Sequence, residues 1–158
     1  MTIRGLYNKI AAIDTDAIAL QCIDETTEEI RQYQLKQLLD GKNSTGSDMT
    51  TYMSDPYFKT PEAAAKYSRW KDEISPKSNR KSGVKNYFIN GYFHDSIKVI
   101  RSGDKVVTAS AVPLGQKIVA KEPYIFGLSP QSKSEFIPLV LRPRFNQKVA
   151  ALIGLKFR

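Results

Sequence analysis

Apolar residues in the first forty positions recur at the spacing of a helix. Two such sets stand along this stretch: Ile10, Ile13, Ile18, Leu20 and Ile23, followed by Ile30, Tyr33, Leu35, Leu38 and Leu39. Their period of three to four residues predicts helix over residues 14–40. Asp40-Gly41 ends it, because glycine readily takes the left-handed conformation found just beyond a helix C-terminus. The pattern leaves open whether this is one helix or two pieces broken near Asp24.

Two polar stretches surround a second predicted helix. Residues 42–55 are rich in Ser, Thr, Asn, Asp and Gly, a composition typical of a loop. Thr60-Pro61 then predicts a helix start, since proline suits the first helical position, and the helical pattern runs as far as Trp70. Residues 71–86 turn basic and are again predicted to be a loop.

The pattern changes to that of strands in the second half of the chain. Residues 97–101 and 105–109 are two alternating runs, and a Gly-containing turn at Gly103 joins them, which predicts a β-hairpin. A third strand is predicted over residues 117–120.

Helical patterning returns near the C-terminus. Ser129-Pro130 is typical of a helix start, and the residues from 129 to 158 favour one or two helices. Pro138 and Pro143 lie inside this segment, and proline lacks the backbone N–H that a helix interior requires. We therefore expect this segment to be kinked or broken at both prolines.

Together these elements predict an α+β fold, in which a small antiparallel β-sheet is flanked by N-terminal and C-terminal helices. The length of 158 residues fits one domain. Its expected parts are helical residues 1–70, a basic loop at 71–86, a β-hairpin region at 87–120 and a C-terminal helical segment at 129–158. The expected core residues, with Trp70 packed against them, are Phe88, Tyr92, Phe93, Ile97, Val99, Val107, Tyr124 and Phe126.

The net charge of +8 is spread unevenly along the chain. Positions 1–60 hold six basic and nine acidic residues, whereas positions 61–158 hold eighteen basic and seven acidic residues. A basic C-terminal portion suits nucleic acid, an acidic partner protein, or the acidic N-terminal portion of a neighbouring copy.

Residues for catalysis or metal binding are scarce. His94 is the single histidine, and its neighbours Asp95 and Ser96 on a strand would point to different faces and could not form a triad with it. One histidine and one cysteine, Cys22, exclude a typical structural zinc site from one chain. The acids between positions 24 and 29 fit a helix N-terminus for dipole reasons alone. We therefore expect a non-enzymatic protein without a metal or cofactor.

Compartment and membrane signals are weak. No apolar run approaches the length that spans a bilayer, and the N-terminus lacks the apolar core of a signal peptide. A single cysteine suits a reducing compartment such as a cytoplasm.

Nucleic-acid binding is the main physical alternative to a purely structural role. Lys77, Arg80, Lys81 and Lys85 cluster just before two aromatic residues, within residues 77–88. Cations that neutralise phosphates beside rings that stack on bases are what such binding requires. No recognised DNA- or RNA-binding motif accompanies the cluster.

Three short motifs resemble a known family. Residues 37–42 read QLLDGK at the end of a helix, tyrosines follow at Tyr52, Tyr57 and Tyr67, and residues 91–99 read GYFHDSIKV before the hairpin. This order is similar to small proteins encoded in tailed-phage structural gene clusters, especially those of Bacteroidetes phages and prophages. The resemblance covers about residues 26–130, and the last motif is similar to a segment of head–tail connector and tail-completion proteins that also leads into a β-hairpin.

The resemblance implies a virion protein that joins portal, neck or tail proteins, present in the host cytoplasm during assembly. The opposed charges suggest a homo-oligomeric ring in which acidic and basic portions of successive copies meet. Loops 42–60 and 71–86 are expected to order on neighbours. The expected interface residues are Tyr52, Tyr57, Arg80, Lys81, Lys85, Arg142, Arg144 and Arg158.

Overall fold

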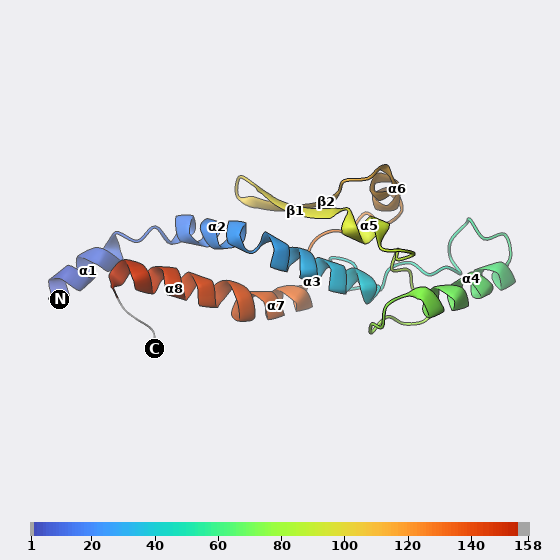
Figure 1. Ribbon diagram of the computed structural model, residues 1–158, viewed down its shortest axis with the longest axis horizontal. Coiled ribbons are helices and arrows are strands. Elements are labelled where there is room, and N and C mark those ends of the chain that lie inside the picture. Colours follow the sequence, from blue (N-terminus) through green and yellow to red (C-terminus); the bar gives the residue numbers. More distant parts are fainter. Residues whose placement is uncertain (1, 155–158) are drawn as a thin grey trace.

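The computed structural model, which describes residues 2–154, is an elongated molecule built on two antiparallel helical rods (Figure 1). Helices α2 (Thr15–Glu25) and α3 (Thr27–Leu39) form one rod. Helices α7 (Pro130–Phe136) and α8 (Arg142–Ile153), with the turn between them, form the other. The predicted α+β class is confirmed, because helices precede and follow one small antiparallel sheet along the chain.

The first rod is divided into α2 and α3 at Thr26. Its backbone leaves helical geometry at φ −116° and ψ 15°, and its Oγ donates a hydrogen bond of 2.8 Å to the carbonyl oxygen of Cys22. Both residues are fully buried. The stretch is therefore two helices, and the break lies at Thr26.

The second rod runs on through both prolines, which corrects the expectation of a kink or break. Ser129 caps α7 by accepting a hydrogen bond from the Ser132 N–H at 3.1 Å. Residues Ile137–Leu141 then form a π-helical turn that contains Pro138, and Pro143 lies in the first turn of α8. A π turn shifts the hydrogen bonding by one residue, so the missing proline donor is accommodated without ending the rod.

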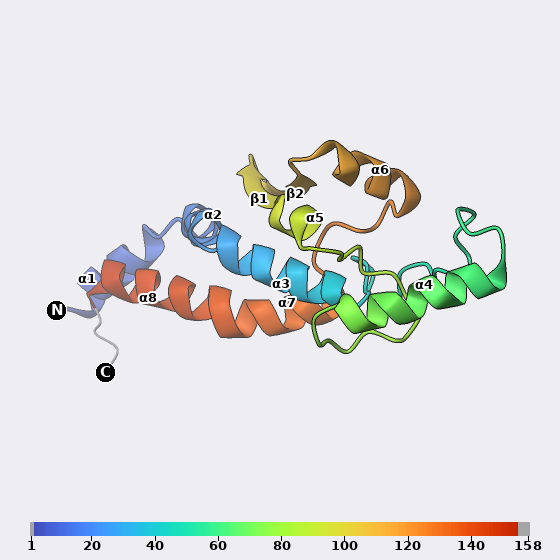
Figure 2. The same ribbon diagram turned by 45° about the vertical axis from the view of Figure 1, so that its right-hand side comes forward.

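The remaining elements lie along one side and at the two ends of the rods (Figure 2). The short helix α5 (Tyr92–Asp95) precedes the hairpin, and α6 (Pro113–Lys121) follows it. Helix α4 (Pro61–Ile74) lies at one end, where Thr60 caps it as predicted by accepting from the Ala63 N–H at 3.2 Å. Helix α1 (Ile3–Ala11) lies at the opposite end.

The predicted hairpin is present. Strands β1 (Ile97–Ser102) and β2 (Lys105–Ser110) pair antiparallel, from Ile97 opposite Ser110 to Ser102 opposite Lys105. Gly103 in the turn has φ 64°, a value that favours glycine.

The prediction of a third strand over residues 117–120 is wrong. Within residues 2–154 the sheet has two strands, and this segment belongs to α6. Four residues are too few for a strand-like pattern to be told apart from the spacing of a helix. Gly115 and Ile118, at helical spacing i and i+3, are the buried residues of α6, and Pro113 lies in its first turn.

A compact core lies where the end of α3 meets the hairpin, α6 and the loops. Its buried residues are Leu38, Met49, Val84, Phe93, Ile97, Ile118 and Ile125, with Phe126 partly buried against them.

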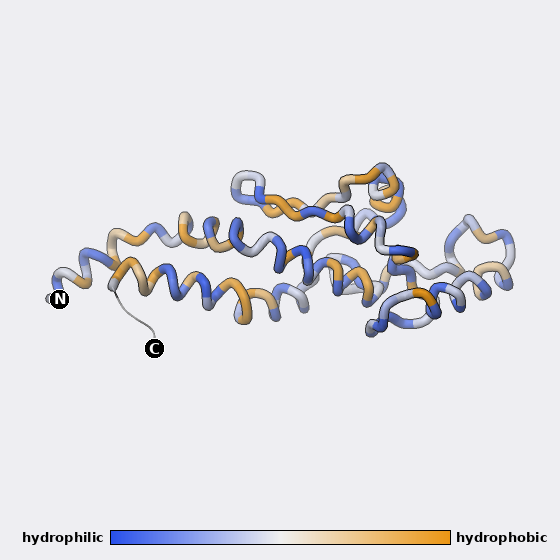
Figure 3. The backbone as a smooth tube through the Cα atoms, in the orientation of Figure 1, coloured by the Kyte–Doolittle hydropathy of each residue, from blue (hydrophilic) through white to orange (hydrophobic). Residues whose placement is uncertain are grey.

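Three of the predicted core residues, namely Tyr92, Val107 and Tyr124, are instead exposed, and so is Trp70, which was expected to pack against the core. Val107 lies on the two-stranded ribbon, whose strands are rich in apolar residues (Figure 3), and Ile100 and Val106 of this ribbon are exposed as well. Trp70 packs on Tyr67, with ring centroids 5.3 Å apart.

Two buried glutamines on α3 hold the chain segment 125–129 against the rod. Gln34 donates to the Ile125 carbonyl oxygen at 3.1 Å and accepts from the Gly127 N–H at 2.7 Å. Gln37 donates to the Gly127 carbonyl oxygen at 2.9 Å and accepts from the Ser129 N–H at 2.7 Å. The side-chain amides thus satisfy backbone groups of a segment that lies outside the two-stranded sheet.

Candidate functional site

The basic loop is neutralised largely inside the chain. Arg80 forms an ion pair of 2.5 Å with Asp72 and donates to the Val84 carbonyl oxygen at 2.7 Å. Lys85 pairs with Asp55 at 2.8 Å. The side chains of Arg80 and Lys85 are each only 5% exposed, so they are internal structural groups and offer little surface to a partner.

The other expected interface residues of the two loops behave differently. Tyr52 is buried, and its ring packs at 5.2 Å from that of Tyr67. Tyr57 is exposed. Lys81 is exposed but pairs with Asp48 at 2.6 Å. The sequence pattern gave these three residues the same expected role, but the structure shows that Tyr52 is buried whereas Tyr57 and Lys81 are exposed.

The expected arginines lie far from these loops. Arg142 is exposed on α8, and Arg144 pairs with Glu29 of α3 and donates to the Glu25 carbonyl oxygen at 2.9 Å. Arg158 lies outside the described residues. Because α8 and α4 occupy different ends of the molecule, the expected interface residues do not gather on one surface (Figure 1).

The opposed charges of the two portions are used within the chain. Among residues 2–154, five ion pairs join an acid of the first sixty positions to a base from later in the sequence: Asp24–Arg101, Glu25–Lys148, Glu29–Arg144, Asp48–Lys81 and Asp55–Lys85. The charge asymmetry therefore no longer argues for head-to-tail contacts between copies.

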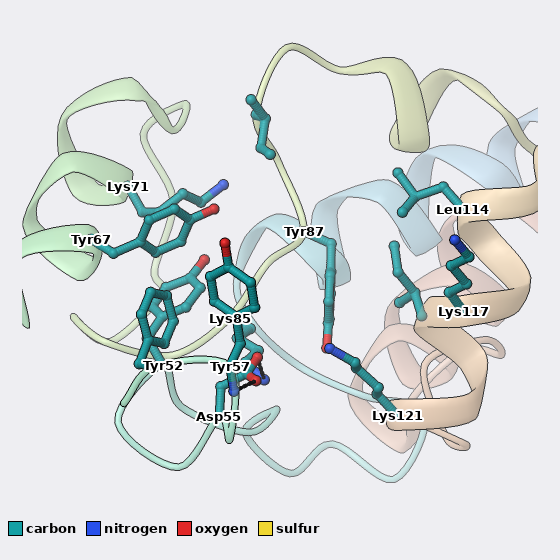
Figure 4. Close-up of a pocket in the computed structure, with 13 residues that line it drawn as sticks. Tyr52, Asp55, Tyr57, Tyr67, Lys71, Lys85, Tyr87, Leu114, Lys117 and Lys121 are labelled. Atoms are coloured by element: carbon teal, nitrogen blue, oxygen red, sulfur yellow. Dashed lines mark hydrogen bonds and ion pairs between the residues drawn. The ribbon is translucent and has the colours of Figure 1, made fainter. Parts of the chain in front are cut away.

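A half-open cavity of about 430 Å³ lies between α4, α6 and the loops that connect them (Figure 4). Tyrosine rings form one wall and apolar side chains of α6 form the other. The lining residues are Tyr52, Asp55, Tyr57, Phe58, Tyr67, Lys71, Lys85, Tyr87, Ile89, Leu114, Lys117, Ile118 and Lys121. Asp55 is the one acid in this lining, and it is already paired with Lys85.

Lys71 is the unusual residue of this cavity. It is 1% exposed, and within the described part of the chain its Nζ has no hydrogen-bond partner. Burial, reinforced by the nearby charge of Arg80, lowers the pKa of Lys71 to about 8. Ala64, Ser68 and Lys71 form the buried stripe of α4 at helical spacing, so a lysine in that stripe is the sequence signal that could have located the site.

The tyrosines that line this cavity are neutral hydrogen-bond donors. Burial raises the pKa of Tyr52, Tyr67 and Tyr87 above the ordinary value. Tyr87 donates to the buried carboxylate of Glu122 at 3.2 Å. The hydroxyls of Tyr52, Tyr57 and Tyr67 and the Lys71 amine point toward the same part of the cavity (Figure 4).

His94 has a structural role in α5, and not at the strand start where it was expected. Its Nε2 lies 2.8 Å from the Asn86 carbonyl oxygen, which only accepts, so Nε2 carries the proton. Ser96 donates instead to the Phe93 carbonyl oxygen at 2.6 Å, and Asp95 is exposed. The local His-Asp-Ser trio does not converge.

Acidification below pH 6.5 is expected to destabilise the fold through His94. Burial lowers the pKa of His94 from the ordinary 6.5, so the unfolded chain takes up a proton that the folded chain excludes. Stability should therefore fall as the pH drops from 6.5 toward the lowered folded pKa. Urea unfolding at pH 7.0 and 5.5 checks this, and His94→Gln should lose the difference between the two pH values. An equal loss in wild type and variant would contradict it.

No group of three or more His, Cys, Asp or Glu side chains within residues 2–154 is placed to hold a metal ion. In the same residues, no helix combines the length and apolar character needed to cross a membrane. No protein-family model, curated protein or solved structure matches the chain. What can be inferred about function therefore rests on the motifs of the sequence and on the molecule's own surfaces and cavities.

Proposed function

We propose that this chain is a non-enzymatic structural protein that joins parts of a tailed-phage virion, at the head–tail connector or tail-completion position. The virion setting comes from the resemblance of residues 37–42 and 91–99 to proteins of that kind. The joining role rests on one observation, the uncovered apolar face of α1.

Helix α1 carries an apolar face that nothing in the described chain covers. Thr2 caps the helix by accepting from the Gly5 N–H at 3.1 Å, yet α1 contributes no buried residue among positions 3–11. Ile3, Tyr7 and Ile10 lie at helical spacing on one face and are 89%, 69% and 52% exposed. A nine-residue helix is marginal in water without packing partners, so such a face favours docking on another protein.

A shallow groove lies at the same end of the molecule, between α1, α2 and α8. Its apolar lining comes from Ile13 between α1 and α2, Ile18 of α2 and Leu152 of α8. Helix α1 and this groove together make a docking end of the molecule, remote from α4 (Figure 1). We take its occupant to be a neighbouring virion subunit, either a second copy in a ring or a portal, neck or tail protein.

Removing the apolar side chains of α1 is expected to weaken assembly. Burial of one such side chain contributes about 1.5–3 kcal/mol, so the combined variant Ile3→Ser/Tyr7→Ser/Ile10→Ser should bind a partner at least about a hundredfold more weakly. Light scattering at low and high salt, alone and with purified portal, neck and tail proteins, measures the mass of each complex. Ile100→Ser, which removes an exposed apolar side chain of β1, is the matched control.

Duplex DNA added to the same samples separates the alternative function. With Arg80 and Lys85 held in internal ion pairs, we expect no increase in mass with DNA at physiological salt. A monodisperse monomer in every protein mixture would overturn the assembly proposal. DNA binding that falls steeply with salt would assign the function to the 77–88 loop instead.

A further inference from the structure

We propose that the cavity between α4 and α6 binds a small organic anion that carries an aromatic ring, with the Lys71 amine as its central cation. This inference concerns a different surface from the docking end, and it does not depend on the virion role. Its starting point is that a fully buried amine has no partner among residues 2–154. A buried polar group left unpaired in a native structure calls for a missing partner.

Among residues 2–154, the acids near Lys71 already have other partners. Asp72 forms an ion pair with Arg80 at 2.5 Å and accepts a hydrogen bond from the Ser82 hydroxyl at 2.6 Å. Asp55 is taken by Lys85 at 2.8 Å. Arg80 lies close enough to Lys71 to disfavour its charge, so this neighbour does not offset the charge of the amine. An external anion would supply the opposite charge that Lys71 lacks among the described residues.

Glu122, the remaining buried acid near the cavity, is also committed. It accepts hydrogen bonds from the Thr50 N–H at 3.1 Å and from the Thr50 and Tyr87 hydroxyls. Each internal carboxylate close to the cavity therefore already has donors of its own.

The tyrosine hydroxyls complete a set of anion donors. Those of Tyr52, Tyr57 and Tyr67 point toward the same space as the Lys71 amine (Figure 4). Two further lysines, Lys117 and Lys121, line the opposite wall from α6. Charge-assisted hydrogen bonds from an ammonium and neutral hydroxyls are the usual means of holding a carboxylate or phosphate.

The rest of the lining suits a ring. Tyrosine and phenylalanine rings face Leu114 and Ile118 across the cavity, and its volume of about 430 Å³ lies in the range of roughly 300–1,000 Å³ typical of small-molecule sites. Aromatic cages can also bind quaternary ammonium ions, but four lining lysines would repel a cation. The combination favours an aromatic anion over an aromatic cation or a bare inorganic ion.

Trp70 provides a built-in reporter for this binding. It is the one tryptophan of the sequence, and its ring lies 5.3 Å from that of the cavity residue Tyr67. Titrating the full chain with benzoate and with phenyl phosphate should change its fluorescence with saturation. Benzyl alcohol, which keeps the ring without the charge, and inorganic phosphate, which keeps the charge without the ring, should each bind at least about tenfold more weakly.

Variants test the assigned role of Lys71. Lys71→Met keeps the length of the side chain without its charge and should weaken benzoate and phenyl phosphate about tenfold or more, while Tyr67→Phe removes a single hydroxyl and should weaken both to a smaller degree. Lys77→Met, an exposed lysine outside the cavity, should leave binding unchanged. Calorimetry repeats the measurement independently of fluorescence. Absence of saturable binding of either anion, equal binding of benzyl alcohol, or undiminished binding by a folded Lys71→Met chain would each overturn the proposal.

Discussion

Replacing Gln37 with leucine is expected to lower the free energy of unfolding by about 3 kcal/mol or more. Gln37 is buried, and its amide bonds the Gly127 carbonyl oxygen, the Ser129 N–H and the Ser132 hydroxyl at 2.9, 2.7 and 3.0 Å. Leucine fills similar space but leaves these polar groups without partners, and each buried orphan costs about 1–3 kcal/mol. Urea unfolding followed by circular dichroism measures the change.

Gln32 supplies the matched control for this prediction. It lies on the same helix, is exposed, and bonds Glu28 alone among the described residues, at 2.6 Å. Gln32→Leu should change the free energy of unfolding by less than about 0.5 kcal/mol. If both variants lost the same stability, the glutamine contacts with segment 125–129 would not be what holds that segment to α3.

Lys71→Met is expected to raise the free energy of unfolding at pH 7 by about 3 kcal/mol. The pKa of Lys71 falls from the ordinary 10.5 to about 8 in the folded chain, so near pH 7 the folded state carries a charged amine that burial disfavours. Wild-type stability should rise as the pH increases from about 8 toward 10.5, because the folded chain then holds fewer protons than the unfolded chain. The variant should lack this rise.

Urea unfolding of wild type and variant at pH 7, 8, 9 and 10 measures both effects. Arg80 disfavours the charge of Lys71, and Lys71 in turn disfavours the charge of His94. Lys66→Met, on an exposed position of the same helix, should change neither the stability nor its pH dependence by much. Destabilisation by Lys71→Met would contradict the expected cost of burying this amine. A rise with pH that persists in the variant would show that another group causes it.

A stabilising Lys71→Met variant would fit the proposed anion site. Residues that bind ligands are often less stable choices than the apolar residues that could replace them, because their exposed or unpaired groups are completed by the ligand. The same substitution should therefore improve the empty protein and impair its binding of benzoate or phenyl phosphate.

Local signals in the sequence located most of the elements. Thr60-Pro61 placed the start of α4, and Gly103 placed the hairpin turn. Each depends on the conformational preference of one or two residues, which neighbours elsewhere in the fold do not change. Prediction failed at residues 117–120, where a short apolar run fitted either period, and at Pro138, where a π turn accommodated the ring.

The candidate pocket could not have been predicted in the same way. Its tyrosines and lysines come from α4, α6 and two loops, and no single stretch of sequence brings them together. The prediction of an interface at the basic loop, residues 71–86, met a related difficulty. Arg80 and Lys85 look like solvent-facing charges until the fold sets Asp72 and Asp55 beside them. Sequence periodicity reports which face of an element is buried, but it carries little information on which distant charge will lie opposite.

The pairing of α8 with α2 has a consequence for how the chain is made. Glu25 and Lys148, which join these helices at 2.8 Å, are 123 residues apart. At about 5–20 residues per second, a ribosome needs roughly 6–25 s to add the residues between them. Until α8 has been made, α2 with its buried residues Ile18 and Cys22 has no α8 to pack against. The two rods can therefore pair only at the end of translation or after it.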